Sequence, residues 1–286
     1  MTRRILLLLP AAVALALVIA LAVYHPLGPP RAPLRFAMGR GPTIVLLHGV
    51  GGSVQQWLPA ARWLARDHRV VLVELPGHGL SPMPEPLTLD RAADALDAAL
   101  AAESKDPVVL VGHAVGGLVA AAVALRHPER VRALVLVETD LRPQAEVQKR
   151  RELLEAIDQD YQGLLRHIYT GLGRDSVQGE RLYSEVSKMS PASIKPWLRL
   201  ELFADVSLRM RHLLPPLLAV FSERSWPREE SWSATARRRG YSEAPNPKTQ
   251  RIEGCGHFLI LDRPRELSRI IEEFAADSSR GPVAAR

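Results

Sequence analysis

The residues best placed to do chemistry form one short stretch, which follows an apolar β-branched run and starts a helix of small residues. It consists of Gly112, His113, Ala114, Val115 and Gly116. This order predicts a strand, a sharp turn and a helix, the geometry of a nucleophile elbow, in which the central side chain projects above a sheet. The central residue is Ala114, which has no nucleophilic atom. Two glycines at this spacing are also common where helices merely pack, so the elbow hypothesis needs support from the rest of the chain.

Three loops elsewhere carry histidine among turn residues. The loop His48-Gly49-Val-Gly-Gly-Ser53 follows an apolar run, and such glycine-rich loops can turn backbone N–H groups toward an anion. It lacks the Gly-Lys-Ser/Thr ending of a phosphate-binding loop, and we expect Ser53 to cap the helix that follows. The other two loops are Pro76-Gly-His-Gly-Leu-Ser81 and Gly254-Cys-Gly-His257-Phe258.

Apolar runs and helical spacings predict the elements that must position these loops. Strands are expected at residues 34–38, 43–47, 69–75, 108–113, 131–137, 216–221 and 248–253. Helices are expected between them, at residues 54–66, 89–102, after Ala114, and at 264–276. Alternation of this kind is typical of a parallel sheet with right-handed crossovers. Residues 141–214 have dense charges, helical spacing and no β-branched run, which predicts a helical insertion.

The N-terminal segment has a composition of its own. Arg3 and Arg4 precede residues 5–24, which are apolar and uncharged, and a proline-rich linker follows to residue 30. The run reaches membrane-spanning length, which favours an uncleaved anchor, although Ala20-Leu-Ala22 offers a cleavage site for a signal peptide. Arginines before such a run keep that end cytoplasmic. We therefore expect a membrane-anchored or exported protein whose main domain, residues 31–276, lies outside the cytoplasm, with a disordered tail at 277–286.

Length and composition limit the size of the core and the kinds of partner and cofactor that the chain can have. A chain of 286 residues with 47% hydrophobic residues can bury one large core. The net charge is +6, but basic residues are scattered and aromatics make up only 5%, so no nucleic-acid partner is expected. The single cysteine, Cys255, excludes an internal disulfide and a cysteine-ligated metal cluster. Neither a metal-ligand cluster nor a dinucleotide fingerprint occurs, so we expect no metal and no cofactor.

The order of the motifs resembles the α/β-hydrolase superfamily, specifically its lid-bearing serine hydrolase lineage, across residues 34–276. The resemblance rests on the His-Gly loop, the Pro-Gly-His-Gly-x-Ser loop, the elbow, the helical insertion and the late Gly-Cys-Gly-His-Phe loop. It implies an α/β-hydrolase fold: a mostly parallel central sheet, flanking helices and a helical cap formed by residues 141–214. It also implies descent from hydrolases of carboxylic esters or amides.

The same resemblance implies roles for particular residues. His257 is the candidate general base. The backbone N–H groups of Val50 and Val115 are the candidate oxyanion hole, and backbone donors survive side-chain replacement. The elbow and its neighbouring loop are contributed by His48, Gly49, Gly112, His113 and Gly116.

The acid that would orient His257 is less easily assigned. Ser225 stands where the superfamily usually has an aspartate, and a hydroxyl cannot stabilise an imidazolium as a carboxylate does. Some branches, such as certain haloalkane dehalogenases, carry the acid at the end of the strand before the insertion, where Glu138 lies. Glu138 is therefore the first candidate and Asp140 the second. The alternative is that Glu138 simply ends its strand in water.

Ala114 prevents the chain from forming an acyl-enzyme. Loss of the nucleophile in a triad enzyme lowers turnover about a millionfold, while the oxyanion hole and binding retain some catalysis. Three explanations stay open: a serine-to-alanine replacement in an otherwise intact enzyme, a non-catalytic pseudohydrolase that binds a small apolar ligand, or a serine-independent enzyme with His257 as base. In each case we expect a small, apolar, ester-like ligand.

Overall fold

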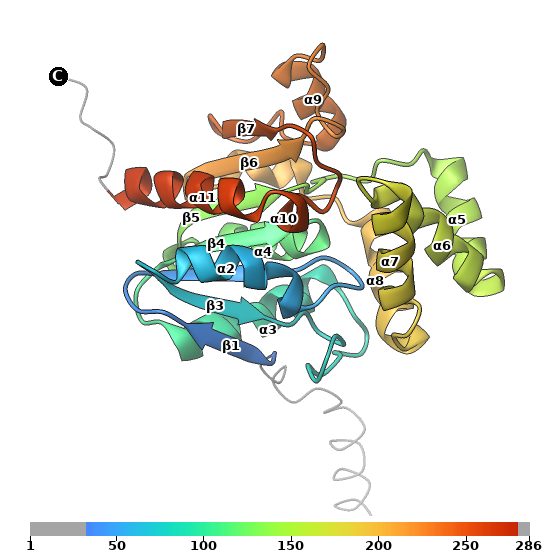
Figure 1. Ribbon diagram of the computed structural model, residues 1–286, viewed down its shortest axis with the longest axis horizontal. Helices are drawn as coiled ribbons and strands as arrows, with labels where there is room; N and C mark the ends of the chain where they lie inside the picture. The colour runs from blue at the N-terminus through green and yellow to red at the C-terminus, as the bar shows by residue number, and fades with distance from the viewer. Residues whose placement is uncertain (1–32, 280–286) are drawn as a thin grey trace, which may run out of the picture. The chain divides into compact units, whose positions relative to one another are not determined.

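Within residues 33–279, seven strands form one sheet in the order β1-β3-β2-β4-β5-β6-β7 (Figure 1). The first, β1 (Arg35–Met38), pairs antiparallel with β3, and the other neighbours are parallel. The remaining strands are β2 (Thr43–Leu47), β3 (Arg69–Val73), β4 (Val108–His113), β5 (Val131–Val137), β6 (Leu217–Ser222) and β7 (Lys248–Ile252). The mostly parallel sheet predicted from the apolar runs is confirmed.

These observations come from a computed structural model that describes residues 33–279, all within a compact unit beginning at Ala32. The predicted anchor or signal segment at residues 1–30 lies outside the described residues, as does the predicted tail from residue 280 onward. Among the residues that are described, no helix has the length and apolar character needed to cross a bilayer.

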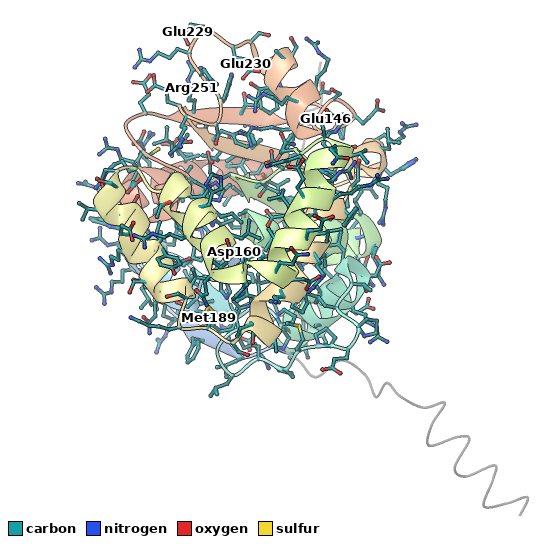
Figure 2. The ribbon with its side chains drawn as sticks, turned by 90° about the vertical axis from the view of Figure 1, so that its right-hand side faces the viewer. Glu146, Asp160, Met189, Glu229, Glu230 and Arg251 are labelled. Carbon is teal, nitrogen blue, oxygen red and sulfur yellow. The ribbon has the colours of Figure 1, made fainter. Side chains whose placement is uncertain are left out.

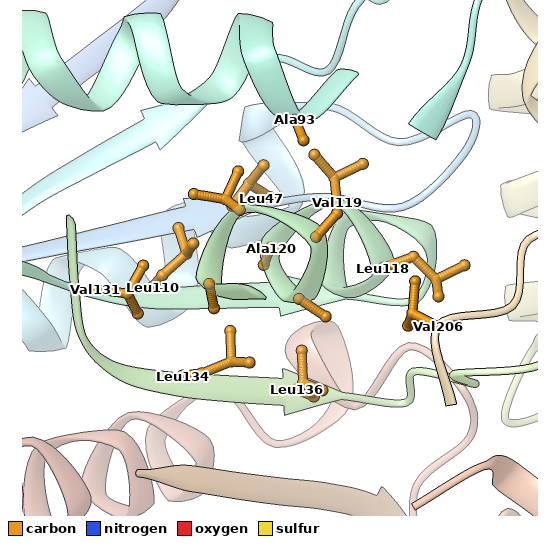
Figure 3. Packing of buried hydrophobic residues seen from close by; sticks show 14 of the residues in the cluster. Leu47, Ala93, Leu110, Leu118, Val119, Ala120, Val131, Leu134, Leu136 and Val206 are labelled. Carbon is orange, nitrogen blue, oxygen red and sulfur yellow. The ribbon is translucent and has the colours of Figure 1, made fainter. Parts of the chain in front are cut away.

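Helices cover both faces of the sheet because strand side chains alternate between them. On one face, Ile44 and Leu46 pack with α2 (Leu58–Leu64) and α11 (Pro264–Ser279). On the other face, Val45 and Leu47 pack with α3 (Leu89–Glu103) and α4 (Val115–Arg126). Figure 3 shows Val119 and Ala120 of α4 among leucine and valine side chains from the strands beneath. Small residues let α4 lie close to the sheet, and this closeness fixes the corner from which α4 begins.

The predicted helical insertion is confirmed and lies between β5 and β6 (Figure 2). It comprises α5 (Val147–Gln159), α6 (Tyr161–Leu172), α7 (Ser176–Val186), α8 (Pro191–Phe203) and the 3-10 helix η3 (Ser207–His212). Asp160 and Asp175 cap α6 and α7 by accepting from Gly163 N and Gln178 N. Helices α5 to α8 share a buried cluster of their own, which Phe258 joins from the main domain. The insertion therefore forms a cap at the carboxyl ends of the strands.

Two boundary predictions are wrong. The helix expected at residues 54–66 starts as a 3-10 turn, η1 (Val54–Trp57), and Ser53 makes no side-chain cap. Gln56 N–H, from which an N-cap side chain would accept, donates instead to the backbone carbonyl of Ser53 at 3.1 Å. Val54 N–H donates to Oε1 of Glu74, 3.2 Å away. The last helix continues to Ser279, so residues 277–279 are helix and not tail; an ion pair of 2.8 Å between Lys248 and Asp277 extends it. Helices at η2 (Pro128–Arg130), α9 (Trp232–Arg239) and α10 (Leu259–Asp262) were not predicted.

Candidate active site

Ala114 lies at a strained corner between β4 and α4. Its backbone has φ 50° and ψ −123°, a conformation that L-residues rarely adopt. The corner is held by hydrogen bonds of 2.9 Å from Ala114 N–H to Val137 O and from Gly117 N–H to Ala114 O. A Cβ on Gly112 would lie 2.5 Å from Gly116 O, and one on Gly116 would collide with His48 O. Both glycines are therefore required for this corner, whatever stands at position 114.

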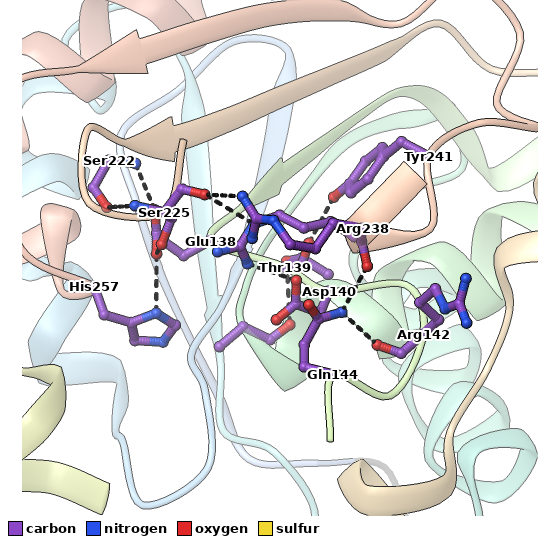
Figure 4. A network of polar contacts seen from close by, with 12 residues as sticks. Glu138, Thr139, Asp140, Arg142, Gln144, Ser222, Ser225, Arg238, Tyr241 and His257 are labelled. Atoms are coloured by element: carbon purple, nitrogen blue, oxygen red, sulfur yellow. Dashed lines mark hydrogen bonds and ion pairs between the residues drawn. The ribbon is translucent and has the colours of Figure 1, made fainter. Parts of the chain in front are cut away.

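His257 and Glu138 are in direct contact at this corner (Figure 4). Nδ1 of His257 lies 3.1 Å from Oε2 of Glu138, which is only 2% exposed. Burial alone would raise the pKa of Glu138, but hydrogen bonds from His257, Ser222 N–H and Ser225 and the charge of His257 outweigh it, so the pKa lies below its ordinary value. An ionised Glu138 only accepts, so His257 donates from Nδ1 and keeps Nε2 free as a base.

The structure separates the other two acid candidates from His257. Ser225 Oγ donates to Glu138 Oε2 at 2.6 Å and so supports the glutamate without reaching the imidazole. Asp140 pairs with Arg239 at 2.6 Å. Burial raises the pKa of Asp140, although Arg239 opposes this shift. Glu138, rather than Asp140, is thus the carboxylate in contact with His257.

The loop that bears Val50 is anchored on both sides of its Val50–Gly51 peptide. The hydroxyl of Tyr169 donates to Val50 O at 2.7 Å, and Gly51 N–H donates to Nε2 of His78 at 3.0 Å. Gly51 has φ +64°, and a Cβ there would lie against Tyr169 and Val186. Among the described residues, no acceptor pairs with the N–H of Val50 or of Val115. Both amides are therefore available to an oxyanion at the corner.

The two histidines next to the corner, His48 and His113, are buried and form hydrogen bonds with neighbouring loops. His48 is fully buried, with Nε2 2.9 Å from Glu74 Oε2. His113 is also fully buried, and its Nε2–H donates to the backbone carbonyl of His257 at 3.0 Å. Burial, followed by the neighbouring charge of His257, lowers the pKa of His113 to about 3, so its ring stays neutral. These two residues position the loops around the corner.

A cavity with two lobes lies between Ala114 and the cap. The tyrosine lobe has a volume of about 290 Å³ and is lined by Val50, Tyr169, Leu172, Leu198 and Phe258. The arginine lobe has a volume of about 240 Å³ and is lined by Leu118, Arg142, Arg150 and Leu202. Both lobes share Ala114, Asp140, Glu201 and His257. Charged groups therefore line the cavity where the lobes meet, and apolar residues line other parts of each lobe. The apolar character of the ligand stays a prediction.

Residues 42–236 match the family described as alpha/beta hydrolase fold. The chain belongs to this family. A hydrolase from Oleispira antarctica superposes with a TM-score of 0.74 at 18% identity, over 86% of this chain and 96% of that one. The α/β-hydrolase fold expected from the order of the motifs is thereby confirmed.

Two curated relatives are esterases. A pimeloyl-(acyl-carrier protein) methyl ester esterase from Chromobacterium violaceum is 38% identical over 133 residues, which are 44% of this chain. That match spans 50% of the Chromobacterium protein. The esterase of the same name from Nitrosospira multiformis is 24% identical over 261 residues, or 84% of this chain and 96% of that protein.

Four residues around this α/β-hydrolase site were missed by the sequence analysis. Glu74 precedes, and His78 lies in, the loop at residues 76–81, which was noted for its motif but given no role in the site. Tyr169 and Glu201 belong to cap helices, and helical spacing alone does not tell which face of a helix lies over the sheet. The one available signal was Glu74, a carboxylate directly after an apolar strand.

Proposed function

We propose that this protein hydrolyses a carboxylic ester with water as the direct nucleophile and His257 as the general base. The observation that carries the proposal is the contact of 3.1 Å between His257 and the buried Glu138, beside a corner that holds Ala114. The esterase relatives support the substrate class. His257 lines both lobes of the cavity, whose volumes are large enough for a small ester and a water molecule.

The reaction can be written without a covalent intermediate. Nε2 of His257 takes a proton from water while the water oxygen attacks the ester carbonyl carbon. The resulting oxyanion accepts hydrogen bonds from Val50 N–H and Val115 N–H, and the ionised Glu138 stabilises the imidazolium. When the C–O bond of the ester breaks, the imidazolium returns its proton to the departing alkoxide. Water and ester are consumed, and a carboxylic acid and an alcohol are formed.

The buried Glu138 favours catalysis over simple ligand binding. Removing a carboxylate from water is unfavourable by several kcal/mol unless hydrogen bonds and a partner compensate. Here two serines and His257 converge on it. A pocket that only bound an ester would need neither this charge nor the histidine in front of it. The observation that favours a binding protein instead is Ala114 itself, at a corner otherwise shaped for a nucleophile.

Hydrolysis of p-nitrophenyl butyrate by the unaltered chain and two variants separates these functions. We expect slow turnover without a pre-steady-state burst, and its loss in His257→Ala. His127→Ala serves as the control, because this partly exposed histidine pairs with Glu129 and, within residues 33–279, with no other ionisable side chain. Ester binding without any turnover identifies a binding protein and contradicts the proposal. A burst equal to the enzyme concentration would show a covalent intermediate and exclude direct attack by water.

A further inference from the structure

We propose that the tyrosine lobe binds an organic cation, the alkylammonium group of an ester, with Glu201 as its counter-charge. The ester part of this inference rests on the proposed function, whereas the cation part does not. Glu201 lies in the last turn of α8 and lines both lobes, as do Ala114 and His257. The site is thus a recognition site within reach of the reacting carbonyl.

Glu201 differs from the other acids of the cavity in having no partner. Glu138 is held by His257 and two serines, and Asp140 is paired with Arg239. Among residues 33–279, no lysine, arginine or histidine forms an ion pair with Glu201, and no donor forms a hydrogen bond with it. An acid that the protein leaves unpaired at a cavity wall is available to a ligand.

The groups around Glu201 fit a cation better than an anion. In the tyrosine lobe the arginine present is Arg239, whose charge Asp140 already takes. Tyr169 and Phe258 line the same lobe, and aromatic rings stabilise organic cations near their faces. The remaining guanidinium groups of the cavity, Arg142 and Arg150, line the other lobe, and Arg150 lies over the ring of Phe203.

The charge state of Glu201 makes the recognition dependent on pH. Glu201 is a solvent-exposed residue at the cavity wall. The protein atoms around its carboxyl raise the pKa to about 6 by desolvation. The charge of His257 lowers this pKa and that of Asp140 raises it further. The other ionisable groups that line the cavity are His113, Glu138, Arg142, Arg150, Tyr169 and Arg239. Glu201 is therefore anionic above about pH 7 and neutral below about pH 5.

A pair of esters that differ only in charge tests the proposal. Acetylcholine carries a quaternary ammonium, and its carbon isostere, dimethylbutyl acetate, has the same shape without the charge. Binding of each to the whole protein is measured by ligand-observed NMR titration, which does not require turnover. At pH 7.5 we expect acetylcholine to bind about tenfold more tightly than the isostere, and the ratio to fall toward one at pH 5.

Two variants test whether the preference for acetylcholine over its isostere comes from the carboxylate of Glu201. Glu201→Gln keeps the side-chain shape and should bring the ratio close to one at pH 7.5. Glu155→Gln removes an equal charge from the exposed face of α5 and should leave the ratio unchanged. Equal affinities in the unaltered chain, failure of both esters to bind, or a ratio that survives Glu201→Gln overturns the inference. Charge discrimination without hydrolysis would instead overturn the proposed function and support the cation site.

Discussion

The hydroxyl of Ser225 donates a hydrogen bond of 2.6 Å to Oε2 of Glu138, although the two residues are far apart in the chain. They follow the neighbouring strands β6 and β5, so their side chains meet at the same edge of the sheet. The same carboxylate oxygen contacts Nδ1 of His257. The two positions at which the acid was expected, after β5 and after β6, therefore bring their side chains together beside His257. In this chain the carboxylate follows β5, and the residue after β6 contributes a serine hydroxyl that donates to it.

A second carboxylate at this place should be destabilising. Ser225→Asp removes a donor from Glu138 and sets two buried acids side by side, so we expect a loss of about 2 kcal/mol in the free energy of unfolding at pH 8. The loss should shrink at pH 5, because one acid can then hold a proton. Urea unfolding at both pH values measures it. Ser225→Ala, which removes only a hydrogen bond, should lose about 1 kcal/mol at either pH. Unchanged stability of Ser225→Asp at pH 8 would contradict the shared site.

Removal of one hydroxyl should test the anchoring of the candidate oxyanion loop. Tyr169→Phe deletes the 2.7 Å hydrogen bond to Val50 O, so we expect ester turnover to fall about tenfold or more through kcat. Tyr161→Phe is the matched control, because among the described residues its buried hydroxyl has no hydrogen-bond partner. Steady-state kinetics of both variants measure the effect. Equal kcat values for the two variants would show that the anchor does not matter.

Two buried histidines should make stability depend on pH. Burial, followed by the charge of a neighbouring histidine, lowers the pKa of His78 and of His113 from 6.5 to about 3. As the pH falls from about 6.5 toward 3, the unfolded chain takes up protons that the folded chain cannot, so stability is lost. Each histidine contributes up to about 1.4 kcal/mol per pH unit in this window. The measurement is urea unfolding from pH 7 to pH 4.

A variant of one histidine isolates its share. His78→Gln retains an acceptor for Gly51 N–H but cannot titrate, so its stability should fall less steeply with pH than that of the unaltered chain. His127→Gln, at a partly exposed position, should keep the original slope. Parallel curves for His78→Gln and the unaltered chain would show that His78 does not remain neutral.

The fold was predictable from the sequence because its strands are apolar on both faces and are separated by regular helical spacings. The run at residues 131–137 matches β5 residue for residue, since both of its faces are covered by helices. The start of the first helix was not predictable, because the chain begins it as a 3-10 turn in which Gln56 N–H donates to the carbonyl of Ser53 and not to its side chain. The residue types alone do not distinguish these two acceptors.

The candidate site was predictable only in its main-domain half. Glu138 and His257 stand at strand and loop ends whose order along the chain suggests proximity, and the structure brings them together. Tyr169 and Glu201 could not be found, because their positions depend on how the cap helices lie over the sheet. Their spacing predicts a helix but not the direction of its polar side chains. Glu201, on the charged wall of the cavity, comes from α8.

The last prediction concerns the missing nucleophile. Ala114→Ser places an Oγ on a corner whose φ of 50° already suits a projecting side chain, next to the free Nε2 of His257. Glu138 is in contact with His257, so the three groups of a triad would be present. We expect labelling by a fluorophosphonate probe and a rise of at least about a hundredfold in hydrolysis of short activated esters. The double variant Ala114→Ser, His257→Ala should lose both gains. A folded Ala114→Ser variant that resists the probe would mean that the pocket no longer presents a nucleophile to an ester, and the corner would then serve binding or direct attack by water alone.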